Sequence, residues 1–141
     1  MPTRTARTIW NGGLNDGKGT VTLASSGVGS YEVNFPKRAA DDADGTTSPE
    51  ELIAAAHSTC FSMALSHGLA GDGHAPQEVD TRAEVDFVPG TGITEIRLTV
   101  RAKVDGISND EFVAAAENAR VNCPVSLALT GTTIKVDAAL K

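Results

Sequence analysis

An apolar run from residue 52 to residue 65 most constrains the fold of this chain. Only four polar residues interrupt it: His57, Ser58, Thr59 and Ser62. A helix begins just before the run, because Ser48 is a good N-cap, Pro49 suits the first helical position and Glu51 completes a capping box. A helix that is apolar nearly all round is buried on most sides. The sequence therefore predicts a central helix, and this helix carries Cys60.

Alternation of apolar and polar residues predicts strands on both sides of the central helix. Strands are expected at residues 5–10, 18–24, 30–35, 78–88 and 132–140, and in the segment GTGITEIRLTVRAKVDG, which forms a hairpin with residues 78–88. A polar loop is expected over residues 36–47, and a second helix runs from Ser108, which has a capping box with Glu111, to about Val121. The order βββ-α-ββ-α-β predicts one α+β domain over residues 1–141, built from antiparallel hairpins and helices.

The charge distribution excludes some partners. The net charge is −6 with acids and bases interspersed, and no Lys/Arg cluster is longer than Lys37-Arg38. This pattern argues against nucleic acid. We find neither the apolar core of a secretory signal nor a stretch long enough to span a membrane, so the expected location is cytoplasmic. In that compartment the two cysteines, Cys60 and Cys123, are not expected to form a permanent structural disulfide.

Several chemistries compete for these residues. His57 and Cys60 share one helix face, as two metal ligands would, but neither cysteine has the nearby cysteine partner that structural zinc usually requires. No P-loop, G-x-G-x-x-G or G-x-S-x-G motif is present, so we expect no cofactor and no serine hydrolase. A Cys60/His57 acyltransferase or hydrolase remains an alternative, although a buried histidine bonded to a carbonyl is the simpler interpretation of His57. A small-molecule carrier with two inert thiols also remains open.

Thiol redox chemistry requires a thiolate. Cys60 lies about three turns inside its helix, where the helix dipole has faded and an apolar setting raises the thiol pKa. A cation must therefore come from elsewhere in the chain. Arg38 is the best donor and Arg7 and Lys37 are weaker ones, although on the residues alone an exposed loop charge is the simpler interpretation of Arg38.

Cys123 is the second candidate nucleophile. It immediately precedes Pro124 at a predicted helix start, where the helix dipole favours a thiolate. Electrostatics alone therefore selects Cys123 as the more reactive thiol. The order in which the two cysteines react stays open on physical grounds.

The segments TSPEELIAAAHSTCFSMALS and NCPVSLAL, with the βββ-α-ββ-α-β order, resemble the OsmC/Ohr family of bacterial hydroperoxide reductases, and its OsmC branch in particular. The resemblance covers nearly the whole chain. It implies that Cys60 attacks the peroxide, that Cys123 resolves it as a disulfide, and that Arg38 and Glu50 complete the site. It also implies sheets wrapped around the cysteine-bearing helix of an intertwined homodimer.

The resemblance further implies a thiol peroxidase of oxidative and osmotic stress defence. Its substrates would be organic hydroperoxides or hydrogen peroxide, and its reductant an external dithiol such as a lipoyl group. Glu50 and Cys60 are ten residues apart on one helix, hence about 15 Å apart along its axis. If both act in catalysis, the site must combine two subunits.

Overall fold

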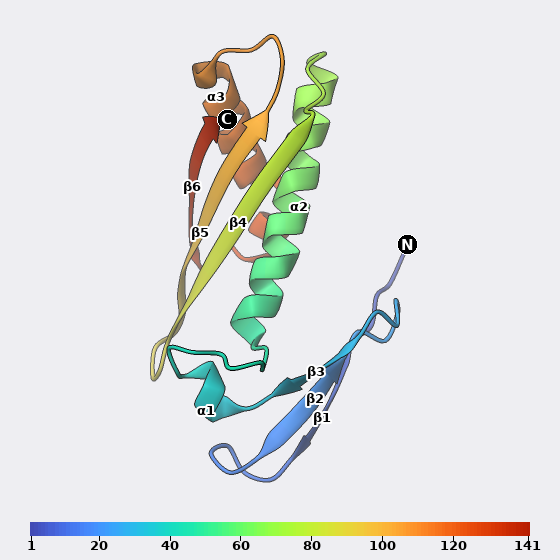
Figure 1. The fold of residues 1–141 in the computed structure, drawn as a ribbon, viewed down its shortest axis with the longest axis vertical. Coiled ribbons are helices and arrows are strands. Elements are labelled where there is room, and N and C mark those ends of the chain that lie inside the picture. The colour runs from blue at the N-terminus through green and yellow to red at the C-terminus, as the bar shows by residue number, and fades with distance from the viewer. The chain divides into compact units, whose positions relative to one another are not determined.

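The computed structural model describes residues 1–141 and divides into two compact units, Met1–Leu52 and Ile53–Lys141. The ten elements, in chain order, are β1 (Arg7–Asn11), β2 (Lys18–Thr22), β3 (Ser30–Val33), α1 (Phe35–Arg38), α2 (Pro49–Gly71), β4 (Glu78–Val88), β5 (Gly92–Lys103), α3 (Asn109–Asn122), α4 (Pro124–Ala128) and β6 (Thr133–Leu140). This order contains the predicted βββ-α-ββ-α-β pattern, with α4 at the helix start predicted for Pro124 and α1 added as a further short helix (Figure 1). The α+β class is confirmed. The prediction of a single domain over the whole length stays a prediction.

The first unit contains an antiparallel sheet in the order β1-β2-β3. Val21 is the only buried apolar side chain of this unit, while Ile9, Trp10 and Tyr31 each keep more than a third of their surface exposed. A unit of this size that buries so little apolar surface has a weak core of its own.

Residues 36–38 belong to α1, so the prediction of a loop over residues 36–47 is wrong for these three residues. Asn34 caps this helix, because its Oδ1 accepts a hydrogen bond from the Lys37 backbone amide at 2.8 Å. Pro36 lies in the first turn, where its missing N–H costs nothing. The strand before it therefore ends at Val33, and Phe35 belongs to the helix rather than to the strand predicted over residues 30–35.

The second unit contains the sheet β4-β5-β6. The predicted hairpin is confirmed, since β4 and β5 pair antiparallel. The expectation of purely antiparallel sheets is wrong for β6, which pairs parallel with β5 and places Val136 beside Leu98. Parallel neighbours need a long crossover connection, and α3 with α4 supplies it between β5 and β6.

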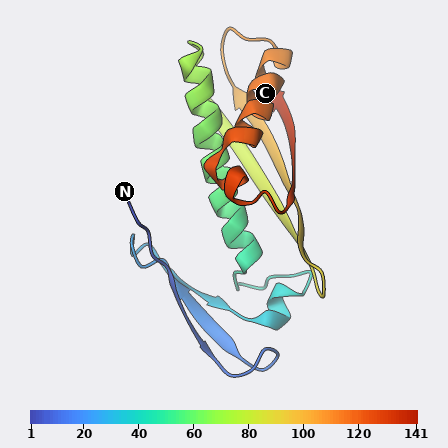
Figure 2. The ribbon, with the colours of Figure 1, turned by 180° about the vertical axis from the view of Figure 1, so that it is seen from behind.

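The core of the second unit lies between this sheet and two helices. Figures 1 and 2 show α2 and α3 on the same face of the sheet. The core residues are Phe61, Leu65 and Leu69 from α2, Leu98, Val100 and Ala102 from β5, Phe112, Ala116 and Ala119 from α3, and Cys123. Every second residue of β5 from Leu98 to Ala102 is buried, so the strand predicted from alternation in this segment is confirmed. The capping box between Ser108 and Glu111 at the start of α3 is also confirmed.

The start of α2 follows the sequence only in part. Ser48 Oγ accepts a hydrogen bond from the Glu51 backbone amide at 3.1 Å, as an N-cap should. The reciprocal half of the predicted capping box is replaced, because the Glu51 carboxylate accepts a hydrogen bond from the Thr47 hydroxyl at 2.6 Å. Thr47 thereby joins the loop to the first turn of the helix.

One face of α2 stays open within a single chain. Its buried stripe consists of His57, Phe61, Leu65 and Leu69. On the other side Ala56 and Thr59 are exposed, and Met63 keeps 68% of its surface accessible. The expectation that this helix is buried on most sides is therefore wrong for the single chain. No helix of the structure combines the length and apolar character that crossing a membrane requires.

Candidate functional site

The structure brings the two cysteines together in the second unit. Cys60 lies on α2 and is partly exposed, whereas Cys123 is fully buried. The Cys60 thiol is within hydrogen-bonding reach of the Cys123 thiol and of the Val125 backbone amide. Both cysteines are free thiols in this structure. Such a pair can form a disulfide after one of them has been oxidised.

Local backbone structure fixes the position of Cys123. This residue ends α3, where its N–H donates to the Ala119 carbonyl at 2.9 Å, and it also precedes α4, where its carbonyl accepts from the Leu127 amide at 3.0 Å. Pro124 disfavours helical backbone in the residue before it, and Cys123 accordingly has φ −55° and ψ 129°. The thiol is thus held at a corner between two helices.

The surroundings of Cys60 favour the neutral thiol. Burial raises the pKa of Cys60, the neighbouring Cys123 thiol raises it further, and the Val125 amide partly opposes both. No positive side chain is among these causes. Within its own unit, therefore, Cys60 lacks the cation that an efficient thiolate nucleophile requires.

Arg38 and Glu50, the two other predicted site residues, meet in the first unit. Arg38 Nη2 donates to Glu50 Oε1 at 2.7 Å, and Arg38 Nε lies 3.1 Å from both carboxylate oxygens. Glu50 is only 8% exposed. A buried carboxylate with a fork-like guanidinium partner fixes the orientation of that guanidinium.

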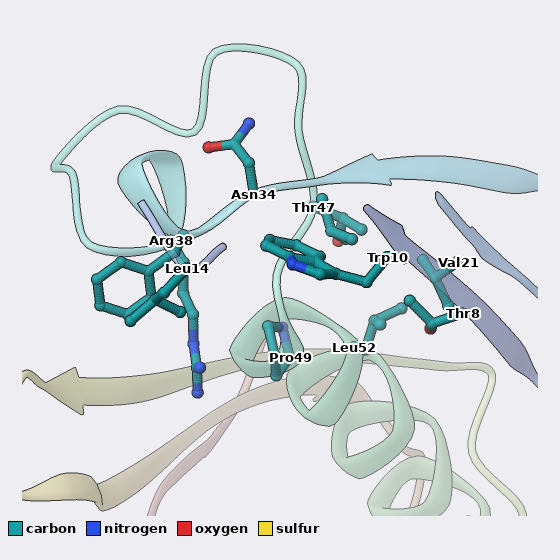
Figure 3. A pocket seen from close by; sticks show the side chains of 11 residues that line it. Thr8, Trp10, Leu14, Val21, Asn34, Arg38, Thr47, Pro49 and Leu52 are labelled. Atoms are coloured by element: carbon teal, nitrogen blue, oxygen red, sulfur yellow. The ribbon is translucent and has the colours of Figure 1, made fainter. Parts of the chain in front are cut away.

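A largely apolar pocket lies beside this ion pair. It has a volume of about 300 Å³, and Trp10, Phe35, Arg38, Pro49 and Leu52 are among its lining residues. Figure 3 shows Trp10 in the middle of the lining, with Arg38 toward one side. The first unit thus offers apolar surface next to a fixed cation.

His57 has a partner that the sequence analysis did not identify. It is fully buried as expected, but its Nε2 lies 2.8 Å from Ser126 Oγ and not against a carbonyl. Its Nδ1 is buried without a hydrogen-bond partner. Ser126 belongs to the NCPVSLAL segment quoted above. Its place in that segment was the only feature of the sequence that could have pointed to Ser126 as a site residue.

The predicted site residues therefore form two pairs, Cys60 with Cys123 and Arg38 with Glu50, one in each unit. Of the weaker cation candidates, Lys37 pairs with Asp44 at 3.0 Å. The structure gathers no group of three or more His, Cys, Asp or Glu residues that could hold a metal ion. The catalytic roles of the four residues stay predictions.

The α+β fold and the pair of neighbouring thiols between helices define the chain as a cysteine-containing α+β protein. Comparison with known proteins identifies its family. The family model for OsmC-like proteins matches residues 41–138. The chain belongs to the OsmC family. It is 38% identical over 135 residues to Peroxiredoxin OsmC of Escherichia coli, covering 94% of this chain and 92% of that protein.

Solved structures agree with this assignment. An organic hydroperoxide resistance protein OsmC from Legionella pneumophila aligns with a TM-score of 0.70 at 25% identity, over 98% of each chain. An organic hydroperoxide resistance protein from Elizabethkingia anophelis aligns with a TM-score of 0.69 at 28% identity, covering 97% of this chain and 96% of that one.

The pairing of Arg38 with Glu50 predicts energetic coupling between them. Replacing Arg38 by alanine leaves the buried Glu50 carboxylate without its cation, so we expect a loss of about 1–3 kcal/mol in the free energy of unfolding. The double variant Arg38→Ala/Glu50→Gln should lose less than the sum of the two single variants, with a coupling energy of about 0.5–3 kcal/mol. Urea unfolding measures all three.

Lys37→Ala is the matched control, because its partner Asp44 is largely exposed. Surface ion pairs contribute about 0–1 kcal/mol, so this control should change stability little. Additive losses in the Arg38 and Glu50 variants would show that the pair is energetically irrelevant.

His57 predicts a pH dependence of stability. Burial lowers the pKa of His57, so between its folded value and the ordinary value of about 6.5 the unfolded chain binds a proton more readily. Stability should be full above about pH 6.5 and should fall as the pH drops toward the folded pKa. Urea unfolding between pH 7.5 and pH 5 should show a shallower decline for His57→Gln, whose side chain does not titrate. Equal slopes would remove His57 as the source.

Proposed function

We propose that this chain is a thiol peroxidase that reduces organic hydroperoxides, and also hydrogen peroxide, in oxidative and osmotic stress defence. The observation that carries the proposal is the closeness of the Cys60 and Cys123 thiols, which suits a cycle through a disulfide. The names of the similar proteins, a peroxiredoxin and organic hydroperoxide resistance proteins, support the same chemistry.

The reaction has three steps. The Cys60 thiolate attacks the distal oxygen of the hydroperoxide, an S–O bond forms, the O–O bond breaks, and the leaving alkoxide takes a proton to become the alcohol. The Cys123 sulfur then attacks the Cys60 sulfenic acid, giving a Cys60–Cys123 disulfide and water. An external dithiol, of which a lipoyl group is one example, reduces the disulfide by thiol–disulfide exchange.

Arg38 supplies the missing cation in this proposal, and Glu50 orients it. Cys60 and Glu50 lie ten positions apart on α2, a rise of about 15 Å for an ideal helix, so the two pairs are proposed to meet across a homodimer. Two observations support a second copy of this chain as the partner. One face of α2 is open around Met63, and the first unit leaves Ile9 and Tyr31 exposed.

The pocket beside Arg38 favours organic substrates. Its lining is largely apolar, with Trp10 and Leu52 facing the space. Apolar substituents of a hydroperoxide gain free energy when they leave water for such a surface, and hydrogen peroxide has none to bury. An apolar wall beside the cation therefore supports discrimination toward alkyl and aryl hydroperoxides.

Thiol titration tests the function. Stoichiometric cumene hydroperoxide should remove two thiols per chain from the wild type. Cys60→Ser should consume no peroxide, because the remaining thiol is only the resolving one. Cys123→Ser should still undergo one oxidation at Cys60, to the sulfenic acid or beyond. Single-turnover oxidation that survives in Cys60→Ser and disappears in Cys123→Ser would reverse the roles.

The same experiment separates the alternatives. A carrier with inert cysteines loses no thiols when peroxide is added. A Cys60/His57 acyltransferase or hydrolase keeps turning over an ester or thioester in Cys123→Ser, whereas the proposed peroxidase stalls after one cycle.

Mixed dimers test the cross-subunit site. Cys60→Ser and Glu50→Ala chains, inactive or nearly so by themselves, should form a mixed dimer with one doubly defective site and one intact site. About half of the wild-type activity per mixed dimer should return, since each site draws on both subunits. Differently tagged chains allow the mixed dimer to be purified before the peroxidase assay.

The matched control mixes two chains that both carry Cys60→Ser, and it should stay inactive. If purified mixed dimers of the first kind are inactive too, the cross-subunit arrangement is wrong. A folded, active monomer at high dilution would exclude the dimer altogether.

A further inference from the structure

One buried polar link between the two cysteine-bearing segments is not used by the proposed chemistry. This link is the hydrogen bond between His57 and Ser126. His57 is completely buried on α2 and Ser126 is 4% exposed on α4, 69 positions later in the chain. His57 Nε2 and Ser126 Oγ are 2.8 Å apart. Neither residue is needed to attack a peroxide or to carry electrons.

The position of this bond relative to the thiols is informative. His57 precedes Cys60 by three residues, so both side chains lie on one face of α2. Ser126 follows Cys123 by three residues and is adjacent to Val125, whose amide reaches the Cys60 thiol. Helices α2 and α4 are therefore joined at two points. Cys60 contacts the Val125 amide, and His57, one turn earlier on α2, bonds to Ser126.

The α4 helix depends on such links. It has five residues, too few for a helix to be stable by itself, and its N-cap position makes no side-chain hydrogen bond. The backbone of Cys123 is fixed to α3 through Ala119 and to α4 through Leu127. A shift of α4 relative to α2 therefore moves the Cys123 thiol relative to Cys60.

The bond is a costly way to fill a core. His57 Nδ1 is buried without a partner, and a buried unsatisfied polar group destabilises the folded state. An apolar residue of similar size would avoid that cost. A directional hydrogen bond does what an apolar contact cannot, because it fixes one helix at one register against the other.

We propose that His57 and Ser126 are positioning residues that hold α4 against α2 so that Cys123 remains within reach of Cys60 when Cys60 has become a sulfenic acid. This inference rests on the proposed function. The resolving step forms the S–S bond, breaks the S–O bond and releases water. A second hydroperoxide competes for the same sulfenic acid, oxidising it irreversibly to the sulfinic acid and leaving as the alcohol.

The ratio of disulfide to sulfinic acid measures this competition. A small displacement between reacting groups can slow an intramolecular step by one or two orders of magnitude, whereas attack by free hydroperoxide does not depend on Cys123. In Ser126→Ala and His57→Leu we expect the ratio to fall about tenfold at a fixed excess of cumene hydroperoxide. Mass spectrometry of the quenched full-length protein gives both products.

Two further variants separate positioning from general damage. His57→Gln places an amide nitrogen near the position of Nε2 and should recover most of the ratio. Ser62→Ala removes another polar link of α2, the 2.7 Å bond from Ser62 Oγ to Thr81 Oγ1 on β4, and should leave the ratio as in the wild type. Urea unfolding checks that each variant is folded. If His57→Leu does not fold, Ser126→Ala decides alone, because alanine suits a helix and removes only a hydroxyl.

The outcomes are distinct. A wild-type ratio in folded Ser126→Ala overturns the positioning role, and so does an equal fall in Ser62→Ala. If the wild type itself loses no thiols to hydroperoxide, the proposed function fails first, and the inference that rests on it fails with it.

Discussion

The contact between Cys60 and Cys123 sets the conditions for the rest of the structure. Burial and the neighbouring Cys123 thiol raise the pKa of Cys60, and the Val125 amide opposes this rise only in part. The same closeness shortens the path to a disulfide. The arrangement thus favours the second step of the proposed peroxidatic cycle and disfavours the first, unless a cation reaches Cys60 from outside its unit.

In the proposed mechanism, Arg38 and Glu50 resolve this conflict by supplying an oriented cation. A free arginine on a loop would be drawn toward water, but Glu50, buried and bonded through three donor–acceptor contacts, holds the guanidinium in one orientation. A preoriented cation loses little when it meets a developing thiolate. The proposed dimer would bring each of these pairs to the thiols of the other subunit, so the ability to ionise Cys60 would depend on assembly.

The sequence predicted the features that are encoded by neighbours along the chain. Alternation identified β5, and the capping signal placed the start of α3 at Ser108. Features that depend on distant contacts were missed. The alternation of residues in β6 does not encode which strand it pairs with or in which direction, so its parallel pairing with β5 was missed. The His57–Ser126 bond was missed because it joins residues 69 positions apart. The helix α1 was missed for another reason, because the Asn34 cap followed by Pro36 was available but its polar context suggested a loop.

Because His57 is neutral, it cannot supply the positive charge that would stabilise a Cys60 thiolate. An imidazolium one turn from Cys60 could have served as the cation, as it does in many cysteine enzymes. Burial lowers the pKa of His57, and its Nε2 is bonded to Ser126, so the ring is neutral near pH 7 and is turned to α4 instead of the thiol. Without a charged His57, Cys60 cannot be activated by its own helix. In the proposed mechanism Cys60 depends on Arg38 for ionisation and would react only where Arg38 is in place, which would restrict its oxidation to the assembled dimer.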